Sequence, residues 1–357
     1  YKRQAYGNSD YYAFHMPGHK RNMELMRARL PYNIDITEID GFDDLHHAEE
    51  LLKELQENAA RVFHAEETHY LVNGSTVGLL SAVMGCTERG GRILMARNCH
   101  KSVYNAVYMN ELRPVYIYPE FSEETDLNGE IHVDQIKKLL EEYEDIQVVV
   151  IVSPTYEGVV SDIEAIAEIV HEYKIPLIVD EAHGAHFGFH SYFPQNANTQ
   201  GADVVIHSLH KTLPSLTQTA LLHMNGKLVD RDSVRRYLHM LQSSSPSYIL
   251  MASIDECIRL VDEEREKVFK PYVEMLCQLR KEIGKLKNLQ LLETMQYDAS
   301  KIVISARGRM SGKELQEILL ENDHLQMEMA AGSYVIAMTG PGDTQEGMNR
   351  LLNALRN

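Results

Sequence analysis

The sequence has no long apolar segment. Its longest unbroken aliphatic run covers only residues 148–152, whereas a helix that crosses a membrane needs about 20 apolar residues. No positively charged leader with an apolar stretch precedes the first domain either. We therefore expect a cytoplasmic protein with no membrane partner.

Cysteine is scarce and scattered. Cys86, Cys99, Cys257 and Cys277 form no Cys-x-x-Cys pair, which favours reduced thiols over disulfides or a zinc site. We expect no bound metal.

Positive charge is in the minority. The chain has 35 basic and 52 acidic residues, a formal net charge of −17, which opposes binding to nucleic acid or to an anionic membrane. A cationic small substrate would be attracted, although an acidic surface also simply keeps a protein in solution.

The remaining composition and patterning are those of a globular α/β protein. A chain of 357 residues, 44% hydrophobic and 24% charged, suits about two domains. From residue 60 to 225, short β-rich apolar runs alternate with helical periodicity, which is typical of a parallel sheet with crossover helices. We expect strands at residues 68–73, 92–96, 114–118, 147–152, 175–180, 203–208 and 219–224.

Helix signals mark the rest of the chain. Ser161 and Glu164 have capping-box spacing at the start of one amphipathic helix, and Ser311 and Glu314 at the start of another. After Gly226 come long charged helical stretches, one of which Pro271 should break or kink. The predicted organisation is an extended N-terminal arm (1–44), a large domain (45–255) and a small C-terminal α+β domain (256–357).

Polar residues follow two of the expected strands. One strand runs into Asp180-Glu181-Ala182-His183, and a later one into Ser208-Leu209-His210-Lys211. In an open parallel sheet, ligands bind outside the carboxyl ends of the strands. An acid and a lysine at such ends are what pyridoxal phosphate requires, because the lysine forms the Schiff base and the acid keeps the pyridine nitrogen protonated.

A phosphate site is also indicated. Asn73-Gly74-Ser75-Thr76 follows a strand and begins an apolar helical segment, so it offers backbone amides and hydroxyls at a helix N-terminus. Ser208 and His210 could complete this site, and His100 could lie flat on the pyridine ring. Each feature alone is common at ordinary caps and strand ends, so their joint order along the chain carries the prediction.

Two rival interpretations fit less well. The Asp180–His183 segment also spells the acidic box of a class of helicases, but the Gly-Lys pairs that begin at Gly226, Gly284 and Gly312 are not followed by Ser or Thr, so the phosphate loop is absent. A metal hydrolase that uses Asp180, His183 and His186 would lack the i, i+4 histidine spacing of a helical zinc site and an obvious further ligand.

The motifs together resemble a known family. They are His-Met-Pro-Gly-His-Lys at 15–20, Asp-Ile-Thr-Glu at 35–38, Asp-Asp-Leu-His at 43–46, Asn-Gly-Ser-Thr at 73–76, Arg-Asn-Cys-His-Lys-Ser at 97–102, Ser-Pro-Thr-Tyr-Glu-Gly at 153–158, Asp-Glu-Ala-His-Gly-Ala-His at 180–186, Ser-Leu-His-Lys-Thr-Leu-Pro at 208–214 and Gln-Ser-Ser-Ser-Pro at 242–246. This set resembles the bacterial ornithine/lysine/arginine decarboxylases, which are pyridoxal-phosphate enzymes of the aspartate-aminotransferase fold. The resemblance covers nearly the whole chain.

The resemblance implies a large domain with a mainly parallel sheet, a small α+β domain and a set of site residues. It implies that Lys211 forms the Schiff base, that Asp180 pairs with the pyridine nitrogen and that His100 stacks on the ring. The other residues that it implies around the cofactor are Ser75, Thr76, Ser208 and His210 at the phosphate and Thr155 and His183 near the ring.

The implied activity is decarboxylation of lysine, ornithine or arginine with pyridoxal 5'-phosphate, as in polyamine biosynthesis. Transamination or another amino-acid lyase reaction on the same fold stays open. The resemblance also implies a homodimer, in which Ser243 and Ser244 of one subunit lie near the phosphate bound by the other. Members usually carry a further C-terminal domain, so we expect a short form whose substrate-reading residues are not assigned.

Overall fold

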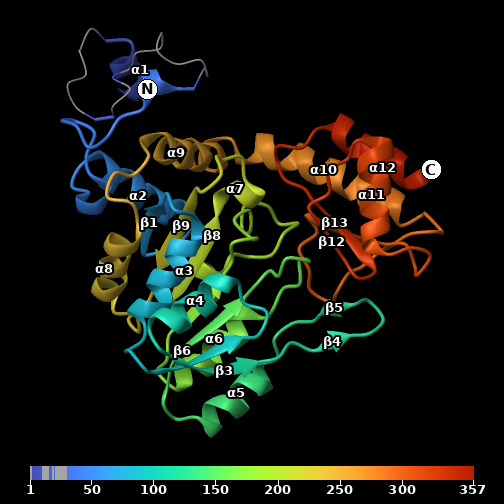
Figure 1. Cartoon of the computed structure of the whole chain (residues 1–357), viewed down its shortest axis with the longest axis horizontal. Coiled ribbons are helices and arrows are strands. Elements are labelled where there is room, and N and C mark those ends of the chain that lie inside the picture. The colour runs from blue at the N-terminus through green and yellow to red at the C-terminus, as the bar shows by residue number, and fades with distance from the viewer. Residues whose placement is uncertain (1, 10–15, 18–19, 21–29) are drawn as a thin grey trace.

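The computed structural model describes residues 2–9, 16–17, 20 and 30–357 (Figure 1). Much of the predicted N-terminal arm, including three residues of the 15–20 motif, lies outside the described residues. The described part of the arm is not extended throughout, because helix α1 (Lys2–Gly7) packs on a 3-10 turn (Tyr32–Ile34). Tyr6 also meets Phe42 edge to face, with ring centroids 5.7 Å apart.

The large domain is built on a seven-stranded sheet with the order β1-β9-β8-β7-β6-β2-β3. The pairs from β8 to β3 are parallel, which confirms the predicted mainly parallel α/β fold. All seven predicted strands form, with ends within two residues of those expected. They are β1 (Glu67–Leu71), β2 (Arg92–Ala96), β3 (Arg113–Ile117), β6 (Ile146–Val152), β7 (Leu177–Asp180), β8 (Val204–Ser208) and β9 (Ala220–Met224).

Strand β9 runs antiparallel to both of its neighbours. Only residues 209–219 join it to β8, and they contain just the one-turn helix α7 (Leu209–Thr212). A parallel crossover needs a dozen or more residues, so the chain turns back at this point. Lys211 lies on the returning segment.

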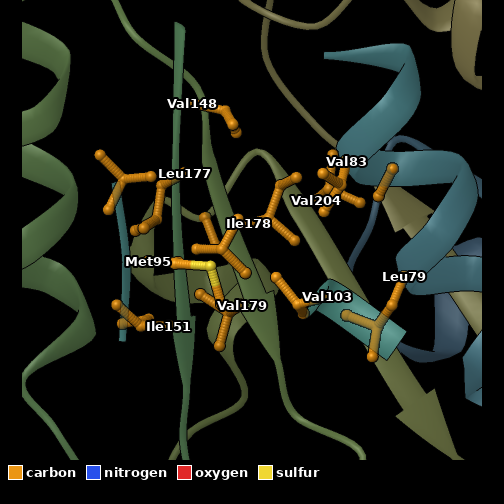
Figure 2. Close-up of a cluster of buried hydrophobic side chains, with 14 of the residues drawn as sticks. Leu79, Val83, Met95, Val103, Val148, Ile151, Leu177, Ile178, Val179 and Val204 are labelled. Carbon is orange, nitrogen blue, oxygen red and sulfur yellow. The ribbon is translucent and has the colours of Figure 1, made fainter. Parts of the chain in front are cut away.

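The main core lies between the sheet and its helices (Figure 2). Val204 of β8 lies beside Val83 of helix α3 in this view, and buried aliphatic side chains of β6 and β7 continue the cluster. The helices of this domain are α2 (Leu51–Val62), α3 (Gly74–Gly85), α4 (Lys101–Met109), α5 (Val133–Glu142), α6 (Ile163–Glu172) and α8 (Arg231–Leu241).

Helix α6 has the predicted apolar face but not the predicted cap. The buried residues of that face are Ile163, Ile166, Ala167 and Val170. The capping box of Ser161 and Glu164 is wrong, because Asp162 is the N-cap and its side chain accepts from the Ala165 N–H at 3.1 Å. Ser161 is buried, and its hydroxyl instead accepts from the Ile131 N–H at 3.0 Å.

Two long helices lead to the small domain, α9 (Tyr248–Glu263) and α10 (Arg265–Ile283). The chain leaves helical geometry at Glu264, whereas α10 continues through Pro271, so the predicted break at the proline is wrong. Phe269 and Tyr272 are buried on either side of the proline. Burial of such side chains offsets the roughly 3 kcal/mol that an interior proline costs a helix.

The small domain is a four-stranded antiparallel sheet with two helices. Its elements are β10 (Gln290–Leu291), β11 (Lys301–Ser305), β12 (Met329–Ala331), β13 (Tyr334–Met338), α11 (Gly312–Asp323) and α12 (Gln345–Arg356). The predicted capping box of Ser311 and Glu314 is confirmed at α11. The boundary expected between residues 255 and 256 falls inside the continuous helix α9.

A hairpin that the sequence did not indicate connects the two sheets. Strands β4 (Phe121–Ser122) and β5 (Leu127–Asn128) extend from the large domain toward the small one (Figure 1). Leu127 packs there with Val303 and Ile336 of the small sheet. Within the described ranges, no helix has both the length and the apolar character that crossing a bilayer requires.

Candidate active site

A cavity of about 190 Å³ lies where β6, β7 and β8 end. The predicted site residues that line it are Ser75, His100, Thr155, Asp180, His183 and Lys211. They come from the first turn of α3, the N-cap of α4, the end of β7, the loops after β6 and β7, and α7. The fold therefore brings together predicted residues that are up to 136 positions apart in the sequence.

Lys211 and His183 form a direct pair in the wall of this cavity. Lys211 Nζ lies 3.0 Å from His183 Nε2. When Lys211 is an ammonium group it only donates, so Nε2 then accepts and the ring proton lies on Nδ1, a buried atom with no hydrogen-bond partner among the described residues. Burial, together with the charges of Lys211 and Lys301, holds the pKa of His183 well below its usual range. His183 is therefore a neutral acceptor.

Asp180 ends strand β7 with only 3% of its surface exposed. It accepts from the Ala182 N–H at 3.2 Å. Burial raises the pKa of Asp180, and the charge of Lys211 opposes this shift. Burial likewise lowers the pKa of Lys211, which favours the neutral, nucleophilic amine.

His100 is held by the start of helix α4. As the N-cap, its Nδ1 accepts from the Ser102 N–H at 3.2 Å and lies 2.6 Å from Ser102 Oγ. Partial burial lowers the pKa of His100, while the charge of Asp180 raises it. The cap thus fixes the imidazole ring at the edge of the cavity.

The first turn of α3 offers open space. Gly74 has φ +74°, and a Cβ built there would meet nothing within 4 Å. Of the predicted phosphate residues, Ser75 borders the cavity and exposed Thr76 does not. Ser208 is fully buried at the end of β8, and its hydroxyl has no partner among the described residues.

Three further predicted residues lie outside the cavity wall. His210 Nδ1 lies 3.0 Å from the Thr219 carbonyl. Ser243 and Ser244 are exposed beyond α8, where the Ser243 N–H donates to Asn73 Oδ1 of the same chain at 3.0 Å. They do not cap the next helix, because Ser247 is the N-cap of α9.

The cavity also contains residues that the sequence argument did not assign. Asn98, Tyr156 and Glu157 follow β2 and β6 within quoted motifs, so the strand-end signal could have found them. Asn128 comes from β5 and had no local signal, because only the hairpin brings it here.

The rival metal site receives no geometric support. His183 pairs with Lys211, whereas His186 Nε2 lies 3.1 Å from Asp298 Oδ1. Over the part of the chain that the structure describes, no three His, Cys, Asp or Glu side chains are placed to hold one metal ion.

Known proteins are similar to this chain in both sequence and fold. A family model described as Orn/Lys/Arg decarboxylase, major domain, matches residues 3–306. The chain is 32% identical to an arginine decarboxylase of Bacillus anthracis, over 96% of this chain and 73% of that protein. It superposes on the Francisella novicida lysine decarboxylase LdcF with a TM-score of 0.86 at 19% identity, covering 99% of this chain and 58% of the other. A structure titled "SPT with PLP" aligns with a TM-score of 0.67 at 15% identity, over 85% of this chain and 75% of the other.

Proposed function

This chain belongs to the Orn/Lys/Arg decarboxylase family, and from that premise we propose that it decarboxylates a basic amino acid with pyridoxal phosphate as its cofactor. The observation that carries the proposal is the convergence of buried Asp180 and the Lys211–His183 pair in one cavity at the strand ends. A relative named arginine decarboxylase and a structural neighbour described as SPT with PLP support the proposal.

The residues around the cavity fit this cofactor. Lys211, a partly desolvated amine, would attach the cofactor covalently, Asp180 would pair with the pyridine nitrogen, and His100 would stack on the ring. Ser75 and the open first turn of α3 suit the phosphate, and the Ser208 hydroxyl, which has no partner among the described residues, lies at the end of a strand that contacts α3. When bound, pyridoxal phosphate supplies an electron sink for the bond that breaks at Cα.

In the proposed reaction, the Lys211–His183 pair carries out proton transfer. Lys211 Nζ and His183 Nε2 are within hydrogen-bond distance, so His183 can accept from Lys211 and orient its amine. The low pKa of buried His183 keeps its ring neutral, which leaves the ammonium form of Lys211 as the acid that returns a proton to Cα after carbon dioxide leaves. His183 Nδ1–H has no partner among the described residues and can donate to a bound group.

Two carboxylates suit a cationic substrate, Glu328 bonded to the lining residue Tyr156 and Glu157 in the wall of the cavity. Glu157 lines it and is held by the Thr155 and Tyr334 hydroxyls, both at 3.0 Å. Glu328 accepts a hydrogen bond from Tyr156, the neighbour of Glu157. Neither carboxylate forms an ion pair with any residue that the structure describes, so both are available to the distal ammonium or guanidinium group of a basic amino acid.

Carbon dioxide release tests the proposal. The purified chain would be incubated with pyridoxal phosphate and carboxyl-labelled lysine, ornithine or arginine, while keto acid is assayed in parallel. Labelled carbon dioxide with the matching amine supports decarboxylation. Keto acid without carbon dioxide would favour transamination, and neither product would refute both.

We propose further that the working unit is a homodimer. Ser243 and Ser244 are short donors, exposed next to the residue that precedes α3, and would reach the phosphate of a second subunit. Replacement of both by alanine should weaken cofactor retention without preventing folding. Full occupancy in a dilute monomer, seen by sedimentation and absorbance together, would contradict the dimer.

A further inference from the structure

We propose that Lys301, a buried lysine of the small domain, is a positioning residue for the Lys211–His183 pair. The inference rests on the proposed function of that pair. Lys301 begins β11, and its side chain and that of Asp298 are both completely buried. Lys301 Nζ donates to the His183 carbonyl at 3.1 Å, to Asp298 Oδ2 at 2.8 Å and to Ser300 Oγ at 3.1 Å.

Residues 298–301 also contact both loops that line the cavity, the one after β6 and the one after β7. The Asp298 N–H donates to the Gly158 carbonyl at 2.7 Å, one residue after Glu157. Asp298 Oδ1 lies 3.1 Å from His186 Nε2 on the loop after β7. Gly158 has φ +93°, and a Cβ there would come within 2.9 Å of Lys301 Cγ, so the loop is shaped to admit this lysine.

Stability alone does not account for a buried ion pair. Desolvation of two charges cancels much of their attraction, and apolar residues of similar volume often replace such pairs without loss of stability. What apolar residues cannot supply is a donor to the His183 carbonyl and a fixed positive charge close to His183. Both features favour the geometry in which His183 stays neutral and accepts from Lys211.

The charges around His183 and Lys211 agree with this role of Lys301. His183 faces positive charge from Lys211, Lys301 and His100 and negative charge from Asp298. Lys211 faces Asp180 and Glu328, which favour its ammonium form, and Lys301, which opposes it. Removal of the Lys301 charge should therefore make Lys211 harder to deprotonate.

Trace labelling with acetic anhydride tests this in the full chain before cofactor is added. Labelling of Lys211 would be followed by mass spectrometry from pH 6 to 11 in the wild type and in Lys301→Met. We expect the labelling midpoint to rise, so that labelling below the midpoint falls about tenfold. Lys301→Arg keeps the positive charge and the N–H donors, so it should restore much of the Lys211 labelling.

Arg280→Met is the matched control. Arg280 is another buried cation that contacts residues 298–301, because it lies on α10 and donates to the Ala299 and Lys301 carbonyls at 2.9 and 3.2 Å. None of its hydrogen bonds to described residues reaches His183, so its loss should destabilise the region without moving the Lys211 midpoint.

An unchanged midpoint in folded Lys301→Met overturns the proposal, and so does an equal shift in Arg280→Met. If Lys301→Met does not fold, Lys301→Gln gives the measurement, because glutamine removes the positive charge but keeps an N–H donor. The labelling needs neither substrate nor cofactor, so its result is independent of whether carbon dioxide is released.

Discussion

Replacement of Glu157 by glutamine should selectively weaken the use of basic substrates. The side chain lines the cavity, and the Thr155 and Tyr334 hydroxyls hold its two oxygens. Glutamine keeps the shape and one of these acceptors but removes the negative charge. A distal ammonium group would then exchange a charged partner for a neutral one.

The size of the effect follows from the difference between the two kinds of hydrogen bond. A bond to a charged group contributes roughly 1.5–3 kcal/mol and a neutral one roughly 0.5–1.5 kcal/mol, a difference of about 1–2 kcal/mol. At about 1.4 kcal/mol per factor of ten, kcat/KM for lysine or arginine should fall about 5- to 30-fold. Because the contact lies far from Cα, the loss should appear mainly in KM.

Steady-state carbon dioxide release measures this loss, with norleucine as a substrate that lacks the distal charge. Glu124→Gln is the matched control, since Glu124 is exposed on the same hairpin that supplies Asn128 but does not line the cavity. Equal losses for lysine and norleucine would refute the reasoning, and so would an unchanged KM for lysine.

Three further outcomes are expected. Lys211→Ala should abolish the visible absorbance of bound pyridoxal phosphate and its trapping by borohydride, and colour that persists would remove Lys211 from the site. Burial and neighbouring His207 hold the pKa of His223 well below 6.5, so the unfolded state takes up a proton that the native state does not. The free energy of unfolding should therefore fall below about pH 6.5 by up to roughly 1.4 kcal/mol per pH unit for this group, and His223→Gln should flatten that decline in urea titrations. Ser311→Ala removes the capping box of α11 and should cost about 1 kcal/mol in the same assay, whereas the control Lys313→Ala, at an exposed position of the same helix, should leave the urea midpoint nearly unchanged.

Local patterns predicted most of the large domain. The strands form where apolar runs occur, because burial on both faces of a parallel sheet selects such runs. The ends of those strands then located Asp180, His183 and Lys211, since parallel strands bring their carboxyl ends to one edge. The capping box at Ser311 was correct for the same local reason, because all its contacts lie within four residues.

The wrong predictions are those in which a tertiary contact competed with a local one. Ser161 has capping-box spacing, yet its hydroxyl accepts a hydrogen bond from the Ile131 N–H, and Asp162 is the N-cap instead. Pro271 should break a helix, yet α10 continues because its neighbours are buried against the core. In both cases burial outweighed a preference worth only a few kcal/mol.

The sequence by itself determined the element types, the family resemblance and the chemistry of the strand ends, because each depends on residues close together in the chain. Only the tertiary structure decided that β9 turns back, that Tyr334 holds Glu157, and that Lys301 reaches the His183 carbonyl. The last two contacts join residues 177 and 118 positions apart. No local pattern encodes such a pairing, because it exists only once the small domain has packed on the large one.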